Sequence, residues 1–277
     1  MTDTEIDQQR YLSFVFFLEK ACGIALGENK QYLVRSRLSL GAKRYQFDSI
    51  NSFIDAVLAG NREYQAVAIE AMTTNETLWF RDLYPFKLLE SPILSQFANQ
   101  SRRFRVWSAA CSSGQEAYSI AMTILNYKKH HQNSFRGGIE ILGTDISEEM
   151  VKRCTVAEYD QLDLSRGLSE QFRAEFFESS DNNKLKLKPE VRALTKFKSI
   201  NLLDSYSSVG KFDVVFCRNV LIYFSVEVKK QILQKIAACL QDGGILFLGA
   251  SESIADLTDS FAIVRCTSGL YYLKKPL

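Results

Sequence analysis

The chain of 277 residues contains only two histidines, His130 and His131, and they are neighbours. Histidine is a common zinc ligand and the usual general base of a Ser-His-Asp triad, so either chemistry would have to use this pair. Both follow two lysines at the end of a segment that we expect to be helical. Cations complement the dipole at the C-terminus of a helix, so we assign these histidines no catalytic role.

Several other features are missing. The first residues contain no basic stretch followed by an apolar run, so we expect no signal peptide. No segment approaches the ~18 apolar residues that span a bilayer, so we expect no membrane insertion. None of the six cysteines forms a CxxC pair, which favours reduced structural thiols and a cytoplasmic location. A net charge of +2 argues against a protein built to coat nucleic acid.

The N-terminal part of the chain has only helical periodicity. Tyr11, Phe14 and Leu18 follow the spacing of one helix face, and Asn29 is a good N-cap for a second helix. Further helices are expected over residues 50–58, 64–72 and about 84–97. We therefore predict an all-helical domain over residues 1–83, followed by a linker helix over residues 84–103.

From residue 104 onwards, short apolar runs alternate with helical segments. This rhythm predicts an α/β domain over residues 104–277 with a mostly parallel sheet that is covered on both faces. Two strand-like runs at the end of the chain, joined by a turn that contains Gly269, predict an antiparallel hairpin. Residues 157–197 break the rhythm, and we interpret them as an inserted antiparallel β-subdomain.

The first strand of the α/β domain is followed by the turn AACSSGQE. This turn lacks the G-x-G-x-x-G pattern of a dinucleotide site, which disfavours a nicotinamide dehydrogenase, and it lacks the GxxxxGK[ST] pattern of a P-loop. A turn with one glycine still presents the N-terminal N–H groups of a helix to a ligand. Glu116 lies three residues after Ser113, so it is either half of a capping box or a ligand of the site.

Polar residues follow the other strands where they end. Asp145 is either a turn residue or an acid that accepts hydrogen bonds from ribose hydroxyls. Open α/β sheets bind ligands at the carboxyl edge of their strands, where we also expect four residues of later strands. These are Asn201, Leu202, Arg218 and Asn219.

The helical region contains a basic group of five residues between positions 30 and 44. Three of its members are seven residues apart and share one stripe of a helix, with a drift of only ~20° per step. The stripe is either a solvated face or a docking surface for an acidic partner. The five residues are Lys30, Arg35, Arg37, Lys43 and Arg44.

Seven blocks of sequence, in order, resemble the chemotaxis receptor methyltransferases of the CheR type. They are TTNETLWFRD, RVWSAACSSGQEAYSIAM, LGTDIS, RGL, INLLD, FDVVFCRNVLIYF and GGILFLGASES. The resemblance implies a helical N-terminal domain and a class I methyltransferase domain with a small inserted antiparallel subdomain. It also implies the cofactor S-adenosylmethionine, the product S-adenosylhomocysteine, and methylation of glutamate side chains on the cytoplasmic helices of chemoreceptors.

The resemblance also implies roles for single residues. It places Asn75, Thr77 and Arg81 in the cofactor pocket, Glu116 at the first turn, and Asp145 at the ribose. Asn201 and Leu202 resemble the pair that lines the adenine. Arg218 and Asn219 resemble the pair beside the methionine end, and Tyr223 matches a tyrosine near the transferred methyl group. We therefore expect Arg81 and Tyr223 to act in catalysis, the basic residues to dock the receptor, and no metal to be used.

The sequence departs from the family pattern in two places. Ser113, Gln115 and Ala117 replace Thr, Glu and Pro in the first turn, and SSDNNKLKLK lacks the glycine-rich turn of members that grip a receptor tether. The resemblance therefore does not extend to tether binding. Two other functions stay open: a nucleic-acid methyltransferase, although an NPPY-like run is absent, and a non-catalytic sensor of the cofactor. We expect a monomer, because no long exposed apolar stripe is evident.

Overall fold

The computed structural model describes residues 5–276. They form two compact units, which we call the helical unit (residues 5–74 and 222–229) and the sheet unit (residues 75–221 and 230–276). The division differs from the predicted boundary at residue 83, because residues 75–83 belong to the sheet unit. No helix within residues 5–276 is long and apolar enough to cross a membrane.

Four helices make up most of the helical unit, as the periodicity predicted. They are α1 (Gln8–Cys22), α2 (Gln31–Arg44), α3 (Ile50–Leu58) and α4 (Arg62–Met72). Their apolar faces meet in a core that includes Tyr11, Phe14, Val34 and Phe53, all fully buried. The side chains of Asp7, Ser49 and Asn61 cap the N-termini of α1, α3 and α4, so each helix begins where its first N–H groups find an acceptor.

The start of α2 differs from the prediction. Lys30, and not Asn29, is its N-cap, and no side chain accepts a hydrogen bond there. The hydroxyl of Tyr11 accepts from the backbone N–H of Lys30 at 3.1 Å and donates to the carbonyl of Gly27. A buried tyrosine of α1 thus contacts the backbone on both sides of Asn29, and the propensity of one residue does not decide this terminus.

The predicted linker helix over residues 84–103 is not a linker. The segment consists of α5 (Tyr84–Leu88), a π-helical turn (Leu89–Ile93) and α6 (Leu94–Phe97). Ser91, which precedes Pro92, leaves the helical conformation at φ −152° and ψ 121°, as expected for a residue before proline. The side chains of Phe86, Leu89 and Leu94 are buried in the core of the sheet unit, to which the whole segment belongs.

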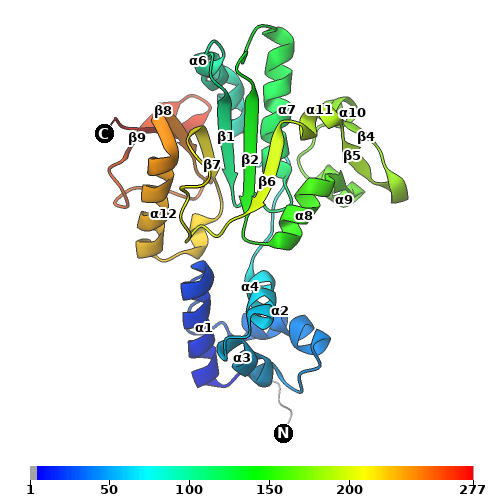
Figure 1. Ribbon diagram of the computed structural model, residues 1–277, viewed down its shortest axis with the longest axis vertical. Coiled ribbons are helices and arrows are strands. Elements are labelled where there is room, and N and C mark those ends of the chain that lie inside the picture. The colour runs from blue at the N-terminus through cyan, green and yellow to red at the C-terminus, as the bar shows by residue number, and fades with distance from the viewer. Residues whose placement is uncertain (1–4, 277) are drawn as a thin grey trace. The chain divides into compact units, whose positions relative to one another are not determined.

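A seven-stranded sheet forms the centre of the sheet unit (Figure 1), in the order β6-β2-β1-β7-β8-β10-β9. The first five strands in this order are parallel, and β10 pairs antiparallel with both β8 and β9. This arrangement confirms the predicted sheet and its C-terminal hairpin. The strands are β1 (Phe104–Ala109), β2 (Ile139–Asp145), β6 (Thr195–Ser199), β7 (Phe212–Cys217), β8 (Leu240–Phe247), β9 (Phe261–Cys266) and β10 (Gly269–Lys274).

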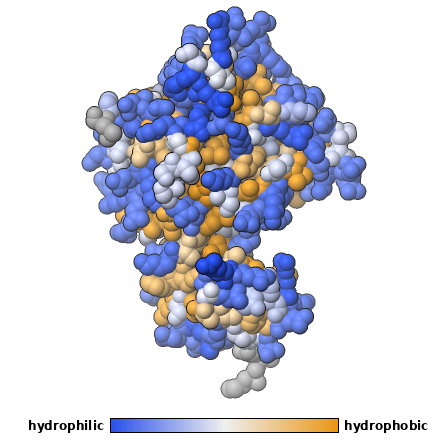
Figure 2. Space-filling view, viewed as in Figure 1, coloured by the Kyte–Doolittle hydropathy of each residue, from blue (hydrophilic) through white to orange (hydrophobic). Residues whose placement is uncertain are grey.

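The helices that connect the parallel strands pack on the sheet. Helix α7 (Gln115–His130) contacts β1, β2 and β6, and α8 (Glu148–Val156) contacts β2 and β6. Helix α12 (Val226–Cys239) leads into β8. Most side chains in the first three turns of α7 are buried, which explains its apolar sequence. Figure 2 shows hydrophilic residues around the margin of this unit and hydrophobic residues towards its middle.

The insertion forms a three-stranded antiparallel sheet in the order β3-β5-β4, as predicted. Trp79 packs edge-on against Tyr159 of β3 at 4.8 Å and Phe177 of β4 at 5.4 Å between ring centroids, which fixes residues 75–83 against the insertion. The last residues of the predicted interval belong to β6 of the main sheet. The elements of the insertion are β3 (Glu158–Tyr159), α9 (Gln161–Ser165), α10 (Glu170–Phe176), β4 (Phe177–Ser179), a 3₁₀ turn (Asp181–Asn183), β5 (Leu185–Leu187) and α11 (Pro189–Arg192).

Candidate functional site

The candidate site lies at the carboxyl edge of the parallel strands. Strand β1 lies between β2 and β7, so the chain leaves it towards one side of the sheet and later returns on the other. Such a switch point is where open α/β sheets bind ligands. The nine predicted cofactor residues all belong to the sheet unit, and Asp145, Asn201 and Arg218 lie at or just past the ends of their strands.

Asp145 organises the turn after β1. Its two carboxylate oxygens accept the backbone N–H groups of Ser112 at 2.7 Å and Ser147 at 3.0 Å, and the residue is only 6% exposed. The Ser112 hydroxyl donates to the carbonyl of Asn75 at 2.8 Å, which joins this turn to residues 75–83. Asp145 thus holds the turn, and a carboxylate is the kind of acceptor that ligand hydroxyls need.

Glu116 is not part of a capping box. Helix α7 has Gly114 as its N-cap, without a side-chain hydrogen bond, and the Ser113 hydroxyl donates to Gln115 instead. The carboxylate of Glu116 accepts from the Ser108 hydroxyl at 2.7 Å and from Arg218 at 3.1 Å. Burial raises the pKa of Glu116, although Arg218, the Ser108 hydroxyl and Arg81 act in the opposite direction. An acid of this kind, with 13% of its side chain exposed, suits a cationic ligand group.

Arg218 connects three segments of the site. Its Nη1 donates to Glu116, while its Nη2 donates to the carboxylate of Asp82 at 2.6 Å and to the carbonyl of Arg81 at 2.9 Å. The Arg218 side chain is 1% exposed, so its guanidinium is removed from water, whereas the side chains of Glu116 and Asp82 are 13% and 31% exposed. Within residues 5–276, the buried Nε of Arg218 has no hydrogen-bond partner. Asp82 was not predicted as a site residue, because its role depends on an arginine 136 positions away.

The segment that bears Arg81 has an unusual backbone. Phe80, Asp82 and Leu83 have φ values of 48°, 65° and 53°, in the left-handed region that non-glycine residues rarely adopt. Arg218 holds this segment through Arg81 and Asp82, and the Ser119 hydroxyl accepts the N–H of Phe80 at 3.1 Å. Strain of this kind persists only where surrounding contacts determine the conformation, and it is typical of binding sites.

Arg81 itself is half-buried, and its Nη1 donates to the carbonyl of Glu76 at 3.2 Å. Thr77 is also half-buried. Glu76 forms an ion pair with Arg166, whose carbonyl accepts the N–H of Trp79 at 3.0 Å. Arg166, the first residue of the RGL block (residues 166–168), therefore supports the segment of residues 75–83, which carries Asn75, Thr77 and Arg81. The sequence did not indicate this role.

The residues after β6 continue this edge. The N–H of Ile200 donates to the carbonyl of Asp145 at 2.9 Å, which places Asn201 and Leu202 beside the end of β2. Leu202 is buried, and its carbonyl accepts the Tyr206 hydroxyl at 2.6 Å. The Asn201 side chain accepts the N–H of Leu203 at 3.0 Å.

Tyr223 and the basic group belong to the helical unit. Tyr223 is half-buried, and its carbonyl accepts the N–H of Ala25 at 2.9 Å. The basic group does not form one uniform stripe, because Arg37 is half-buried and donates to the carbonyls of Met72 and Thr73 and to the Thr74 hydroxyl. Arg37 therefore stabilises the C-terminus of α4, and the other four members are exposed.

The chain matches two family descriptions that together span most of its length. Residues 10–73 match the CheR methyltransferase all-alpha domain, and residues 75–270 match the CheR methyltransferase SAM binding domain. The chain belongs to the CheR methyltransferase family. The boundary between the two matches agrees with the division between the helical and sheet units at residues 74 and 75.

Curated relatives of similar length support this membership. The chain is 49% identical to a chemotaxis protein methyltransferase of Vibrio parahaemolyticus, over 99% of this chain and all of that protein. It is 48% identical to chemotaxis protein methyltransferase 1 of Vibrio cholerae over the same shares. It is 47% identical to the chemotaxis protein methyltransferase Cher2 of Pseudomonas putida, over 95% of this chain and 96% of that protein.

The CheR site fits S-adenosylmethionine, which carries hydroxyls, an ammonium, a carboxylate and a sulfonium. Asp145 offers a buried acceptor for hydroxyls, and Glu116, 13% exposed in its side chain, offers a carboxylate for a cation. The unpartnered Nε of Arg218 and the half-buried guanidinium of Arg81 are donors for an anionic group. Among the described residues, no group of three or more His, Cys, Asp or Glu side chains could hold a metal ion.

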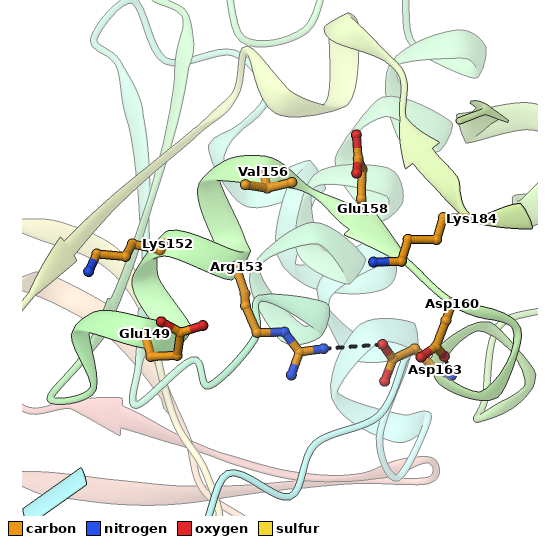
Figure 3. A pocket seen from close by; sticks show the side chains of 8 residues that line it. All are labelled: Glu149, Lys152, Arg153, Val156, Glu158, Asp160, Asp163 and Lys184. Atoms are coloured by element: carbon orange, nitrogen blue, oxygen red, sulfur yellow. Dashed lines mark hydrogen bonds and ion pairs between the residues drawn. The ribbon is translucent and has the colours of Figure 1, made fainter. Parts of the chain in front are cut away.

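A pocket of about 250 Å³ lies between α8 and the insertion (Figure 3). It contains none of the predicted site residues. Arg153 of α8 and Asp163 of α9 form an ion pair across it at 3.3 Å, which links the insertion to the α8 helix. The pocket is lined by Glu149, Lys152, Arg153, Val156, Glu158, Asp160, Asp163 and Lys184.

Proposed function

We propose that this CheR protein transfers methyl groups from S-adenosylmethionine to glutamate side chains on the cytoplasmic helices of chemotaxis receptors, which gives glutamate methyl esters. One observation carries the proposal: in a sequence that matches both CheR domains, Asp145 ends strand β2, and Glu116 lies in the first turn of α7, the helix that follows the adjacent strand β1. Carboxylates can accept hydrogen bonds from the hydroxyls and the ammonium group of such a cofactor.

We infer that the cofactor is held by nine residues of the sheet unit. Asp145 accepts the ribose hydroxyls, and Glu116 accepts the ammonium group. Asn201 and Leu202 line the adenine, while Arg218 and Asn219 lie beside the methionine end. Asn75, Thr77 and Arg81 complete the pocket from the segment that Arg218 holds in place. When bound, S-adenosylmethionine supplies an electrophilic methyl group on a sulfonium.

The chemistry of the acceptor requires little from the protein. A glutamate carboxylate has an ordinary pKa of about 4.3, so it reaches the site already ionised and needs no general base. The two histidines lie at the end of α7 and are exposed, which agrees with a reaction that needs no general base. Catalysis then depends on positioning the carboxylate and excluding water, which can supply several kcal/mol.

Arg81 and Tyr223 are the residues that we assign to catalysis. Charge is lost when a carboxylate and a sulfonium become an ester and a thioether, so strong stabilisation of the charged ground state would slow the reaction. We infer that Arg81 orients the carboxylate of the substrate or cofactor rather than neutralising it, and that the Tyr223 ring lines the path of the methyl group.

The exposed basic residues of the helical unit provide the receptor contact. Receptor methylation helices carry glutamates, and Lys30, Arg35, Lys43 and Arg44 present the complementary charge. Arg37 supports α4 and contributes to this surface only in part. We further infer that the protein acts as a monomer in the cytoplasm, where the receptor helices lie, and that nucleic acid is not a substrate.

A methyl-transfer assay tests the proposal. Labelled S-adenosylmethionine is incubated with a receptor cytoplasmic fragment or, separately, with RNA. We expect label in the receptor fragment that mild base releases as methanol, because a glutamate methyl ester is base-labile. Label on RNA, or base-stable label on the fragment, would refute the proposed reaction, and cofactor binding without transfer would indicate a sensor.

A further inference from the structure

The ends of β7 and β8 are joined by one side chain that sequence reasoning did not single out. The two strands are parallel neighbours, and Phe216 is in register with Phe247. The chain therefore leaves both strands at the same edge of the sheet. Past this point the strands no longer pair, and the backbone N–H groups of Asn219 and Gly249 need other acceptors.

Glu252 supplies that acceptor for both groups. Its Oε2 atom accepts the N–H of Asn219 at 2.7 Å and the N–H of Gly249 at 2.7 Å. A tight turn brings the side chain back, because the N–H of Glu252 donates to the carbonyl of Gly249 at 2.9 Å. Hydrogen bonds to an ionised acceptor are short and about twice as strong as neutral ones.

The backbone around this carboxylate is closely packed. A Cβ atom at Gly249 would lie 2.7 Å from Nδ2 of Asn219, 2.7 Å from Oε2 of Glu252 and 2.9 Å from the N atom of Asn219. Asn219 has a φ of 58°, in the left-handed region that asparagine tolerates better than most residues. The conformation of Asn219 thus depends on contacts with Gly249 and Glu252.

We propose that Glu252 is a positioning residue for the methionine end of the cofactor pocket, a role that rests on the proposed function. It fixes Asn219, and through the backbone it sets the position of Arg218, whose side chain contacts Glu116, Arg81 and Asp82. Without the carboxylate, the N–H groups of Asn219 and Gly249 lose their common acceptor. Asn219, in the loop after β7, can then leave its left-handed conformation.

Three variants test this role by calorimetric titration with S-adenosylhomocysteine. Removal of the acceptor in Glu252→Ala is expected to weaken affinity about tenfold. Glu252→Gln keeps a carbonyl oxygen that can accept both N–H groups, so its affinity should fall by only about threefold. Glu178→Ala, at an exposed acid of β4, is the matched control and should bind as the unaltered protein does.

Steady-state kinetics separate positioning from a general structural defect. In Glu252→Ala, KM for S-adenosylmethionine should rise about tenfold while KM for the receptor fragment stays unchanged. If Glu252→Ala does not fold, Gly249→Ala replaces it, because its Cβ displaces Asn219 and the same loss is expected.

Four results bear on the proposal. Equal affinity of Glu252→Ala (or its replacement) and the unaltered protein would overturn it, and so would an equal loss in the Ala and Gln variants. An unaltered protein that fails to bind S-adenosylhomocysteine would instead refute the proposed function. A large loss in Ala with a small loss in Gln supports the positioning role.

Discussion

Ion pairs in the two units of the protein differ in how far they are buried. In the sheet unit, Arg218 is 1% exposed in its side chain and pairs with Glu116 and Asp82. In the helical unit, the pair between Arg10 and Asp55 leaves about half of each side chain in water, at 41% and 50%. The buried charge of Arg218 holds the geometry of the site, whereas an exposed pair such as Arg10 and Asp55 is solvated and joins two helices only weakly.

The difference has an energetic consequence. Breaking a buried pair by removing one partner costs about 3–5 kcal/mol, because the remaining charge is left without compensation. An exposed pair contributes about 0–1 kcal/mol and is screened by salt. Equivalent substitutions in the two units should therefore differ in effect, and the comparison can be tested directly.

The largest effect is expected for Arg218→Ala. The change leaves Glu116 and Asp82 unpaired, so the free energy of unfolding should fall by about 3–5 kcal/mol and S-adenosylhomocysteine binding should be lost. Urea denaturation measures the first effect and calorimetry the second. Arg10→Ala in the helical unit is the control and should cost less than about 1 kcal/mol. Similar losses in the two variants would remove the distinction between the units.

Asp145→Asn should weaken S-adenosylhomocysteine binding by about 10- to 100-fold. The amide keeps one acceptor oxygen but loses the charge that strengthens the hydrogen bonds to Ser112, Ser147 and the ligand hydroxyls. Asp259→Asn, at an exposed site, is the matched control for calorimetry. Unchanged affinity in Asp145→Asn would show that Asp145 is only a turn residue.

Arg81→Ala and Tyr223→Phe test the assignment of catalytic residues. Loss of the orienting guanidinium should lower kcat/KM for methyl transfer by about tenfold or more, since misplacement of reacting groups reduces effective molarity. The Tyr223 change should have a smaller effect in the same direction. If neither variant alters kcat/KM, the catalytic assignment is wrong.

The lowered pKa of Glu140 makes the stability of the sheet unit depend on pH. A hydrogen bond from Lys196, together with Arg105, lowers the pKa of Glu140 to about 2. Because the folded pKa lies below the unfolded value, this stabilisation is present above about pH 4.5 and is lost as the pH falls towards 2. Glu140→Gln should lower the free energy of unfolding by about 1–2 kcal/mol at pH 7. Urea denaturation at a series of pH values should also show that this free energy falls less steeply below about pH 4.5 than in the unaltered protein. An unchanged pH profile would contradict the prediction.

The smallest effect is expected on the exposed basic surface. Charge reversal of Arg35, Lys43 and Arg44 to Glu should raise KM for a receptor fragment a few-fold at low salt, and the difference should disappear as ionic strength increases. Arg37→Ala should instead lower stability, because Arg37 holds the end of α4. A charge-reversed variant with normal KM at low salt would remove this surface from receptor docking.

The sequence predicted the parallel sheet, the insertion and the hairpin because these depend on local periodicity and turn residues. It also placed Asp145, Asn201 and Arg218 at one sheet edge, since strand ends meet there in a parallel sheet. It could not decide between a cap and a ligand for Glu116. That choice depends on Ser108 and on Arg218, which is 102 positions away.

The features that differ from the prediction also depend on contacts between residues far apart in the sequence. Arg37 looked like a member of a solvated stripe, but it donates to a helix end 35 positions along the chain. Residues 84–103 were predicted as a linker helix, because helical spacing of apolar residues indicates a helix but does not reveal that it packs into the sheet unit. Asp82 and Glu252 stand in short polar stretches, and only tertiary hydrogen bonds give them a role.

Peptide mapping by mass spectrometry of a receptor cytoplasmic fragment tests the central claim most directly. The fragment is incubated with S-adenosylmethionine and either the unaltered protein or Asp145→Asn at a cofactor concentration below saturation. We predict single methyl groups on glutamate side chains, removed by mild base and strongly reduced with Asp145→Asn. Methyl groups on other residues, or an equal yield from both proteins, would contradict the account.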